Sequence, residues 1–402
     1  MYYLHIDCNS YFASCEIATR PELRGKPVVV ANANEKGGGV VLALNAEAKA
    51  TGLTRGIPLF KAKQLIEQAH VVVCPADHDK YHAISDRIMQ TVIDQGIVQD
   101  FVQYSIDEFF GTLPIDDPTL LRSYTQKVKN LIWQATSIPV GCGCSQTYTL
   151  AKVATHYAKR YPAYGDICIL PPESREKALA QLPIGEVWGI GRRLRQPLID
   201  AGYTTALALA SAPQSALEPL LTTAGLRTYL ELRGIPSITL RQHPRRKSIM
   251  QSRTFAEMTS SAESLEAALA TFTNQCCSTL RQQHSLCSTV TIFLATNPYR
   301  TDLLQYSNQA STHLDRPTAD TPTILRTVSL LLRSIFRPGY LYKRAGVLLT
   351  GIIADEGHQL NLFSHETDRQ RSALMSLADD LNRRFGKSSL TFGHLPPSPP
   401  ST

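Results

Sequence analysis

Apolar and polar residues along the first 145 positions follow a pattern that predicts an ordered series of strands and helices. An apolar run opens the chain at residues 2–6, and Ile84, Ile88 and Val92 recur at helical spacing. The predicted strands cover 2–8, 99–105, 108–114 and 138–144, and the predicted helices cover 79–94 and 117–135. This order, β-α-β-β-α-β, is the split-βαβ plan, in which we expect the first and third strands side by side and antiparallel at the sheet centre.

The same order of elements is predicted a second time after the basic stretch 245–247. Strands are predicted at 248–256, 287–296, near 303–306 and at 345–353, and a second helix at 322–336. The first helix begins at 262 and places its apolar residues on one face: Leu265, Leu269, Phe272, Cys276 and Leu280. A length of 402 residues suggests two to four domains, so we expect an α+β multidomain protein with two similarly ordered modules.

Three carboxylates are predicted to meet at one end of the first module. Asp107 and Glu108 are adjacent in an otherwise apolar hairpin, and Asp7 ends the first strand. If the first and third strands are neighbours, Asp7 faces this pair, and three converging carboxylates form a site for a hard cation such as Mg²⁺. The alternative is that Asp107 and Glu108 are a solvated turn pair and Asp7 is a helix N-cap.

Charge is distributed unevenly along the chain. The net charge is −5 over residues 1–117, +6 over 118–240, +7 over 241–352 and −1 over 353–402. An acidic segment followed by two basic ones suits a metal site beside surfaces that hold a polyanion, although basic excess can also serve solubility alone. Nine cysteines without a Cys-x-x-Cys pair are expected to be reduced packing thiols rather than zinc ligands or disulfides.

Several ordered motifs resemble those of the Y-family (lesion-bypass) DNA polymerases, and most closely the UmuC-like catalytic subunits of bacterial DNA polymerase V. The residues that carry this resemblance are Asp7 to Glu16, Gly25 to Val30, Asn45 to Lys49 and Tyr104 to Glu108. The similarity runs from residue 2 to about residue 393. No segment is long and apolar enough to span a membrane, and the strand-like start at residue 2 argues against a signal peptide.

The resemblance implies the architecture of a right-hand polymerase. We expect a split-βαβ palm, small fingers, a helix-hairpin-helix thumb, a second split-βαβ little-finger domain and a C-terminal tail. The corresponding ranges are 1–10 with 75–165 for the palm, 11–74 for the fingers, 166–240 for the thumb, 241–353 for the little finger and 354–402 for the tail. The glycine run 37–39 within the fingers could equally be a plain flexible loop.

The same resemblance implies the roles of the candidate active-site residues. Asp7 and Asp107 would bridge two Mg²⁺ ions, Glu108 would hold the ion that activates the primer 3′-hydroxyl, and the Cys8 carbonyl would bind the triphosphate-side ion. Phe12 has the steric-gate position, where an aromatic ring blocks a ribose 2′-hydroxyl, and Tyr11 is expected to contribute backbone to the triphosphate site.

Lysines are expected to hold the triphosphate of the incoming nucleotide. By resemblance Lys49 contacts it, as does Lys159 on a helix predicted from Thr147 to Tyr161. Lys152 lies two helical turns before Lys159 and hence on the same face. A lysine pair of this kind is also common on a solvated helix face.

Two basic segments are candidate contacts to primer-template DNA. Residues 183–202 are predicted as a helix, the turn Gly189-Ile190-Gly191 and a second helix, a pattern whose turn amides hold a DNA phosphate without reading sequence. Arg192, Arg193 and Arg195 add charge there, and Pro197 either kinks the second helix or delays its start. The second segment is Arg245, Arg246 and Lys247.

The tail carries a pentapeptide that resembles the bacterial β sliding-clamp-binding motif. Its candidate anchors are Gln359, Leu360, Leu362 and Phe363, and the alternative is that Leu362 and Phe363 pack back onto the preceding domain. A helix is predicted at 367–385, and a Pro- and Ser-rich end at 396–402 is expected to be disordered. A UmuD-like dimer is a further candidate partner implied by the resemblance.

The predicted function is template-directed DNA synthesis across damaged template, within an SOS-type damage response in the bacterial cytoplasm and nucleoid. A nucleotidyl cyclase also uses carboxylates on a split-βαβ fold, but it has no use for a helix-hairpin-helix or a clamp peptide. A catalytically inactive scaffold that recruits repair factors is the non-enzymatic alternative. Such a scaffold would not need the three carboxylates Asp7, Asp107 and Glu108, all of which are present.

Overall fold

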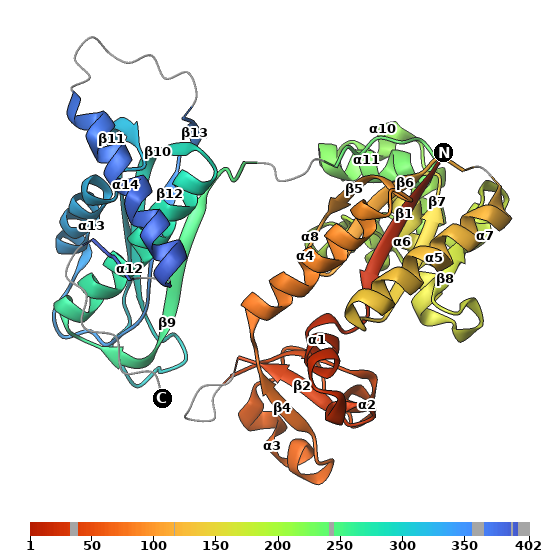
Figure 1. Cartoon of the computed structure of the whole chain (residues 1–402), viewed down its shortest axis with the longest axis horizontal. Coiled ribbons are helices and arrows are strands. Elements are labelled where there is room, and N and C mark those ends of the chain that lie inside the picture. Colours follow the sequence, from red (N-terminus) through yellow and green to blue (C-terminus); the bar gives the residue numbers. More distant parts are fainter. Residues whose placement is uncertain (33–38, 116, 241–244, 356–365, 387–388, 393–402) are drawn as a thin grey trace. The chain divides into compact units, whose positions relative to one another are not determined.

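The computed structural model describes residues 1–32, 39–115, 117–240, 245–355, 366–386 and 389–392. The chain divides into two compact units, Met1–Gln242 and His243–Thr402 (Figure 1). Within the described residues no helix is long and apolar enough to cross a membrane. All nine cysteines are free and buried, as expected for packing thiols.

A five-stranded sheet organises the first unit. Its strands are β1 (Tyr2–Cys8), β5 (Gln99–Gln103), β6 (Glu108–Leu113), β7 (Val140–Ser145) and β8 (Ile167–Ile169). The order β5-β6-β1-β7-β8 places β1 between β6 and β7, antiparallel to both. The predicted adjacency of the first and third strands is confirmed. The short strand β8, parallel to β7, was not among the predicted elements.

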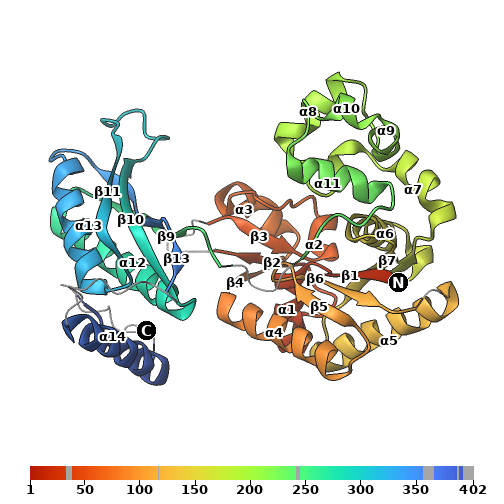
Figure 2. The same ribbon diagram turned by 90° about the horizontal axis from the view of Figure 1, so that it is seen from above.

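Helices cover both faces of this sheet. In the view from above, α4 (His78–Asp94) and α5 (Pro118–Thr136) lie on one side and α6 (Tyr148–Arg160) on the other (Figure 2). Leu4 and Ile6 of β1 are fully buried in the core that α4 and α5 share. His5 and Asp7, which alternate with them, face α6. Strand pleating therefore directs Asp7 to the α6 side of the sheet.

A smaller sheet lies beyond the end of β1. It consists of β2 (Val28–Ala31), β3 (Val41–Leu44) and β4 (Val72–Pro75) in the order β3-β2-β4. The helices that accompany it are α1 (Tyr11–Thr19), α2 (Ala46–Ala50) and α3 (Leu59–Gln68). Its own apolar core includes Val29, Leu53 and Ala62. After β1 the chain continues almost directly into α1. The first residues of α1 therefore lie close to the carboxylate at the end of β1.

Residues 175–232 form an all-helical region on the α6 side of the sheet. Its helices are α7 (Arg175–Gln181), α8 (Arg192–Asp200), α9 (Ala206–Ser211), α10 (Gln214–Leu217) and α11 (Thr223–Leu232), and they share a core with α6. The expectation of a full helix before Gly189 is wrong, because only the 3-10 turn Ile184–Glu186 precedes it. Pro183 and Gly185 disfavour a longer α-helix there. Pro197 lies inside α8, on its exposed side.

The second unit is built on a five-stranded sheet covered on one face by two helices. Its elements are β9 (Ile249–Thr259), α12 (Ala262–Gln282), β10 (Ser285–Thr296), β11 (Ser307–Thr318), α13 (Thr321–Ile335) and β12 (Tyr342–Thr350), with the two-residue β13 (Ile353–Ala354). The strand order is β11-β10-β12-β9. The order of elements along the chain matches the first unit, but here the second and fourth strands are central rather than the first and third.

The prediction of a short strand near 303–306 is wrong. The third strand is the twelve-residue β11, and residues 303–306 lie in the loop before it. β11 is an edge strand, and Leu314 is its one buried residue. An edge strand with one face in solvent needs little apolar sequence, so the periodicity that identifies central strands is missing there.

The tail helix α14 (Glu366–Phe385) packs against α12, and its bounds agree with the predicted helix at 367–385. Met375 and Ala378 are buried, and the Arg281 guanidinium on α12 donates to both carboxylate oxygens of Asp379, at 2.6 and 2.8 Å. The Asn274 amide on α12 also exchanges hydrogen bonds with the backbone of Phe392. The predicted clamp motif at 359–363 and the end at 396–402 lie outside the described residues.

The approach of α6 to β7 generates a stability prediction. A β-carbon at Gly143 would overlap backbone atoms of Ala151 and Thr155. Gly143→Ala should therefore destabilise the first unit by about 3 kcal/mol or more, because backbone atoms cannot move aside as side chains can. Both tryptophans, Trp133 and Trp188, lie in this unit, so urea unfolding followed by tryptophan fluorescence measures the loss.

The control for this experiment is Gly191→Ala. A β-carbon there meets no atom within 4 Å, and the loss should be about 1 kcal/mol or less. Equal stability of Gly143→Ala and the wild-type chain would contradict the tight packing of α6 on β7.

Candidate active site

The register of β1 against β6 brings the predicted carboxylates together. Asp7 is paired with Glu108 across the two strands, and the Cys8 amide donates to the Asp107 carbonyl at 2.9 Å. The side chains of Asp7 and Glu108 are 27% and 20% exposed, so solvent and ligands can reach both. The structure therefore places all three carboxylates at the end of β1, as the strand order predicted.

Asp107 lies in the tight turn that joins β5 to β6. The Tyr104 and Ser105 amides both donate to the Glu108 carbonyl, at 2.9 and 3.2 Å, and close the turn. The Ser105 hydroxyl donates to Asp107 Oδ1 at 2.6 Å and accepts from the Asp107 amide at 3.3 Å. Ser105 thereby holds the orientation of the half-buried Asp107 carboxylate.

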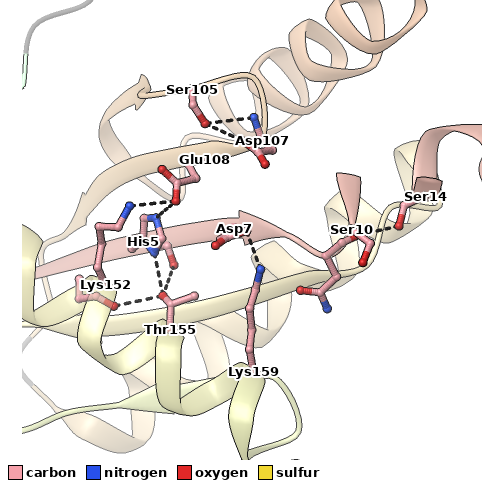
Figure 3. Close-up of polar contacts among 12 residues, drawn as sticks. His5, Asp7, Ser10, Ser14, Ser105, Asp107, Glu108, Lys152, Thr155 and Lys159 are labelled. Atoms are coloured by element: carbon pink, nitrogen blue, oxygen red, sulfur yellow. Dashed lines mark hydrogen bonds and ion pairs between the residues drawn. The ribbon is translucent and has the colours of Figure 1, made fainter. Parts of the chain in front are cut away.

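Two lysines of α6 reach the carboxylates (Figure 3). Lys159 Nζ is 2.5 Å from Asp7 Oδ1, and Lys152 Nζ is 2.9 Å from Glu108 Oε1. The α6 helix begins at Tyr148, where the Thr147 hydroxyl caps the Leu150 amide. Two turns separate the lysines, so one helix face serves both carboxylates.

The methylene groups of Lys159 lie directly over Gly141 of β7. A β-carbon at Gly141 would be 2.8 Å from both Cγ and Cε of Lys159. Any larger residue at 141 would therefore displace the lysine from Asp7.

Three aromatic rings surround the Lys152 ammonium group. Its distances to the ring centroids are 5.3 Å for Tyr104, 5.8 Å for Phe110 and 5.3 Å for Trp188. The Trp188 indole donates to the Tyr104 hydroxyl at 3.3 Å, which links two of the three rings in this aromatic cage. Cation–π attraction from the rings adds to the ion pair with Glu108. A cavity of about 370 Å³ lies beside these residues, between α6 and Trp188.

His5 lies beneath Glu108 in the interior. Its Nδ1 is 2.9 Å from the Thr155 hydroxyl, and Nε2 is 3.9 Å from Glu108 Oε1 without a hydrogen-bond partner among the described residues. Burial lowers the pKa of His5 well below its ordinary value, and the charges of Lys152 and Lys159 lower it further. The imidazole is therefore neutral, and an uncharged side chain lies beneath the carboxylate site.

The described residues contain no group of three His, Cys, Asp or Glu side chains already arranged around a metal position. The donor set itself suits Mg²⁺, since it consists of carboxylates on adjacent backbone segments. In this arrangement the ammonium groups of Lys152 and Lys159 balance the charges of Glu108 and Asp7. The residues thus fit a hard cation in their chemistry and backbone placement, and the lysine contacts would have to change when one binds.

The first turn of α1 lies immediately after β1, and Tyr11 and Phe12 differ sharply in their surroundings. Tyr11 is 4% exposed, and its hydroxyl donates to the Tyr81 carbonyl at 2.7 Å. Phe12 is half-buried and stacks on the Tyr81 ring, with centroids 4.4 Å apart and an interplanar angle of 15°. Only the Phe12 ring is therefore accessible to a ligand, whereas Tyr11 can offer its backbone amide, which lies in the unpaired first turn of the helix.

Lys49 projects from α2 toward the same helix terminus. Its Nζ lies 3.5 Å from the hydroxyl of Ser10, which is the N-cap residue of α1. The buried Asn45 side chain fixes α2, because it accepts from the Ala48 and Val28 amides and donates to the Lys26 carbonyl. The sequence Asn45-Ala46-Glu47-Ala48-Lys49 therefore places a cation beside the α1 terminus.

The predicted DNA-binding residues occupy two separate places. Gly189 has φ +85°, a conformation that favours glycine, and Gly191 is the N-cap residue of α8. Arg192, Arg193 and Arg195 are exposed on the first turns of that helix. Arg245, Arg246 and Lys247 are exposed at the start of the second unit.

Sequence reasoning did not assign roles to His5, Tyr104 or Trp188. His5 lies two residues before Asp7 on the same strand face, so its position beside the carboxylates could have been predicted from the sequence. The cage of Lys152 depends on side chains from β5–β6, α6 and the turn before α8, and no local pattern links these segments.

Comparison with solved structures identifies the fold. A Y-family DNA polymerase chimera of Dbh and Dpo4 has a TM-score of 0.69 and 22% identity, and the match covers 88% of this chain and all of the other. The insertion ternary complex of Dbh DNA polymerase has a TM-score of 0.56 and 21% identity, with the same coverage. The fold is that of the Y-family DNA polymerases.

Sequence comparison identifies the family. Residues 6–156 match the impB/mucB/samB family, and residues 246–362 match the C-terminal domain of that family. The chain is 34% identical to the UmuC protein of Salmonella typhimurium and to the MucB protein of Escherichia coli, over 96% of its length and 92% and 91% of theirs. It is 30% identical to DNA polymerase IV of Methanoculleus marisnigri, over 82% of this chain and 88% of that one. The chain belongs to the impB/mucB/samB family of Y-family DNA polymerases.

The lowered pKa of His5 generates a prediction for stability against pH. Below the ordinary histidine pKa of about 6.5, the unfolded chain binds a proton at His5 that the native chain excludes, so stability falls as pH falls. The slope approaches about 1.4 kcal/mol per pH unit well below pH 6.5. In His5→Gln this contribution should vanish, and urea unfolding between pH 6.5 and 5 should show the shallower dependence.

His82→Gln, a change at an exposed histidine of α4, controls for the substitution itself. An unchanged pH dependence in His5→Gln would show that His5 accepts a proton in the native state.

Proposed function

We propose that this chain carries out template-directed DNA synthesis across damaged template, transferring a nucleotide from a deoxynucleoside triphosphate to a primer 3′-hydroxyl. The observation that supports this most is the β1–β6 register, which sets Asp7 opposite Glu108 with Asp107 beside them. The family membership supports the same activity. One related structure is an insertion ternary complex of Dbh DNA polymerase, which supports a site that takes both DNA and a nucleotide.

Asp7, Asp107, Glu108 and the Cys8 carbonyl are the residues that would hold two Mg²⁺ ions. When bound, the ions would lower the pKa of the primer 3′-hydroxyl and neutralise charge on the leaving pyrophosphate. Asp7 and Asp107 would be shared between the two positions, and Glu108 would serve the primer side. Lys152 and Lys159 balance the carboxylate charge before the site is loaded.

The nucleotide triphosphate is proposed to lie at the start of α1. The first-turn amides of this helix, including that of Tyr11, point to a terminus that favours an anion. Lys49 reaches this terminus from α2, and Lys159 reaches it from α6 once it leaves Asp7. These two lysines would bring positive charge to the triphosphate from α2 and α6, and the exposed part of the Phe12 ring would meet the sugar at its 2′-position.

Primer-template DNA is proposed to bind through its phosphates. The first-turn amides of α8 after Gly189-Ile190-Gly191, together with Arg192 and Arg193, suit a phosphate contact that reads no sequence. Arg245, Arg246 and Lys247 supply a second basic segment. Over residues 118–352 basic side chains exceed acidic ones by 13, so binding should weaken steeply with salt.

Further partners are proposed on sequence alone. Gln359, Leu360, Leu362 and Phe363 resemble a β sliding-clamp ligand, whose apolar anchors would fill a pocket on the clamp. The similarity to UmuC and MucB proteins supports a UmuD-like dimer as a second partner and an SOS-type role in the bacterial cytoplasm and nucleoid.

The first test of the proposed activity removes the carboxylate charges without changing shape. Asp107→Asn and Glu108→Gln should each reduce primer extension at least about 1,000-fold, because a neutral amide cannot hold a divalent cation as a carboxylate does. Primer-template affinity should change less than about threefold, since DNA is held by the basic segments. Extension rates with Mg²⁺ and binding by fluorescence anisotropy measure the two effects.

Asp94→Asn, which neutralises an exposed carboxylate at the end of α4, is the matched control and should extend primers normally. Extension within a few-fold of wild type in Glu108→Gln and Asp107→Asn would contradict the proposed site.

The second test concerns sugar selection. Phe12→Ala should raise the incorporation of ribonucleotides relative to deoxyribonucleotides by about 100-fold or more, because no ring remains to clash with the 2′-hydroxyl. Tyr11→Ala is the comparison that fixes the register, since the Tyr11 ring is buried and its hydroxyl is bonded to Tyr81. If Tyr11→Ala alone changes the ratio of kcat/KM values, the assignment of Phe12 is off by one residue.

A further inference from the structure

The ring of Phe12 is supported from behind by an aromatic side chain of α4. Tyr81 stacks on Phe12 with centroids 4.4 Å apart and planes 15° from parallel. The Tyr81 side chain is fully buried. His78, one turn earlier on α4, meets the edge of the Phe12 ring, with centroids 5.5 Å apart and an angle of 88°. Movement of Phe12 away from a ligand would therefore push directly against Tyr81.

The Tyr81 ring is itself anchored at its far end. Its hydroxyl donates to Glu16 Oε1 at 2.7 Å, and Glu16 is only 1% exposed. Lys80 Nζ donates to both oxygens of Glu16 at 2.9 Å, and the Arg20 guanidinium contacts the same carboxylate. Burial raises the pKa of Glu16, but the Tyr81 hydroxyl and the Lys80 ammonium outweigh it, so the pKa is lowered and the carboxylate stays charged.

The backbone of residue 81 holds the other aromatic residue of the pair. The Tyr11 hydroxyl donates to the Tyr81 carbonyl at 2.7 Å, which ties the first turn of α1 to α4. Tyr81 thus holds both aromatic residues of α1: its carbonyl accepts a hydrogen bond from Tyr11, and its ring stacks on Phe12. Tyr81 links the two sites, because its ring stacks on Phe12 and its hydroxyl donates to Glu16.

The free-energy cost of admitting a ribose 2′-hydroxyl cannot exceed the cost of moving the Phe12 ring out of its way. If Phe12 could tilt or slide away, the cost of admitting a 2′-hydroxyl would be that of a small rotamer displacement, of order 1 kcal/mol. A ring that stacks on a fully buried and anchored tyrosine cannot yield without disturbing close-packed interior atoms. The discrimination should therefore depend on what lies behind Phe12 as well as on Phe12 itself.

We propose that Tyr81 is a positioning residue for sugar selection, which holds the Phe12 ring against a ribose 2′-hydroxyl and is itself held by Glu16. This inference rests on the proposed polymerase activity and on Phe12 as the residue that meets the sugar. It adds α4 and the carboxylate of Glu16 to the determinants of nucleotide choice.

The test compares the kcat/KM values for a ribonucleotide and for the matching deoxyribonucleotide opposite one template base. Tyr81→Leu should raise the ribonucleotide-to-deoxyribonucleotide ratio at least about tenfold, which corresponds to about 1.4 kcal/mol. Tyr81→Phe keeps the ring but removes the anchor on Glu16, so it should fold and raise the ratio about threefold. In both variants the change should appear in the ribonucleotide value, with the deoxyribonucleotide value nearly constant.

Tyr229→Leu is the matched control, because Tyr229 of α11 is also fully buried with a bonded hydroxyl but belongs to the core shared by α6 and α11. It should cost comparable stability and leave the ratio unchanged. A loss of packing alone would lower both kcat/KM values together.

Phe12→Ala, measured in parallel, separates this inference from the function on which it rests. If Phe12→Ala changes the ratio but Tyr81→Phe or Tyr81→Leu stays within twofold of wild type, the role of Tyr81 is overturned and that of Phe12 stands. If Phe12→Ala leaves the ratio unchanged, the assignment of sugar selection to Phe12 is overturned, and the role of Tyr81 with it.

Discussion

The antiparallel register of β1 against β6 is the constraint on which the candidate site depends. Side chains along a strand alternate between the two faces of the sheet, so a slip of one residue would turn Asp7 toward the α4 and α5 core and bring Ile6 out of it. The apolar residues Leu4 and Ile6 prevent such a slip because they are fully buried. Core packing on one face of β1 thus fixes the position of the carboxylate on the other face, and stability and function are set by the same few residues.

Asp7 and Glu108 are paired across β1 and β6, and α6 provides a positive charge for each of them. Lys152 and Lys159 reach Glu108 and Asp7 only because α6 lies very close to β7, where Gly141 and Gly143 leave room for the lysine stem and the helix backbone. Glycines in a central strand weaken it locally. Here they permit a helix approach that no other residue would allow. The rings around Lys152 add to its ion pair with Glu108, and the side chain of Lys159 is the more exposed of the two, at 28% against 19%.

The sequence allowed the carboxylate site to be predicted because strand order alone brings Asp7 to Asp107 and Glu108. Central strands and amphipathic helices can be recognised from periodic apolar residues, and this pattern predicted the start of α12 and both bounds of α13 to within one residue. The bounds of β11 could not be predicted in this way, because an edge strand with one buried residue has no periodic apolar pattern. The partners of Lys152 and the support of Phe12 by Tyr81 were also beyond prediction, since each joins segments that meet only after the helices dock.

The two units show that strand pairing, rather than the order of elements, decides where chemistry can occur. Both follow β-α-β-β-α-β, but the first strand is central in the first unit and lies at an edge in the second. The central strands of the second unit, β10 and β12, contain no Asp or Glu, so these two strands supply no carboxylate to the middle of that sheet. Its net charge of +7 over residues 241–352 instead suits contact with a polyanion. One plan of elements, paired in two ways, therefore brings three carboxylates to the end of a central strand in the first unit, whereas the second unit carries an excess of basic residues.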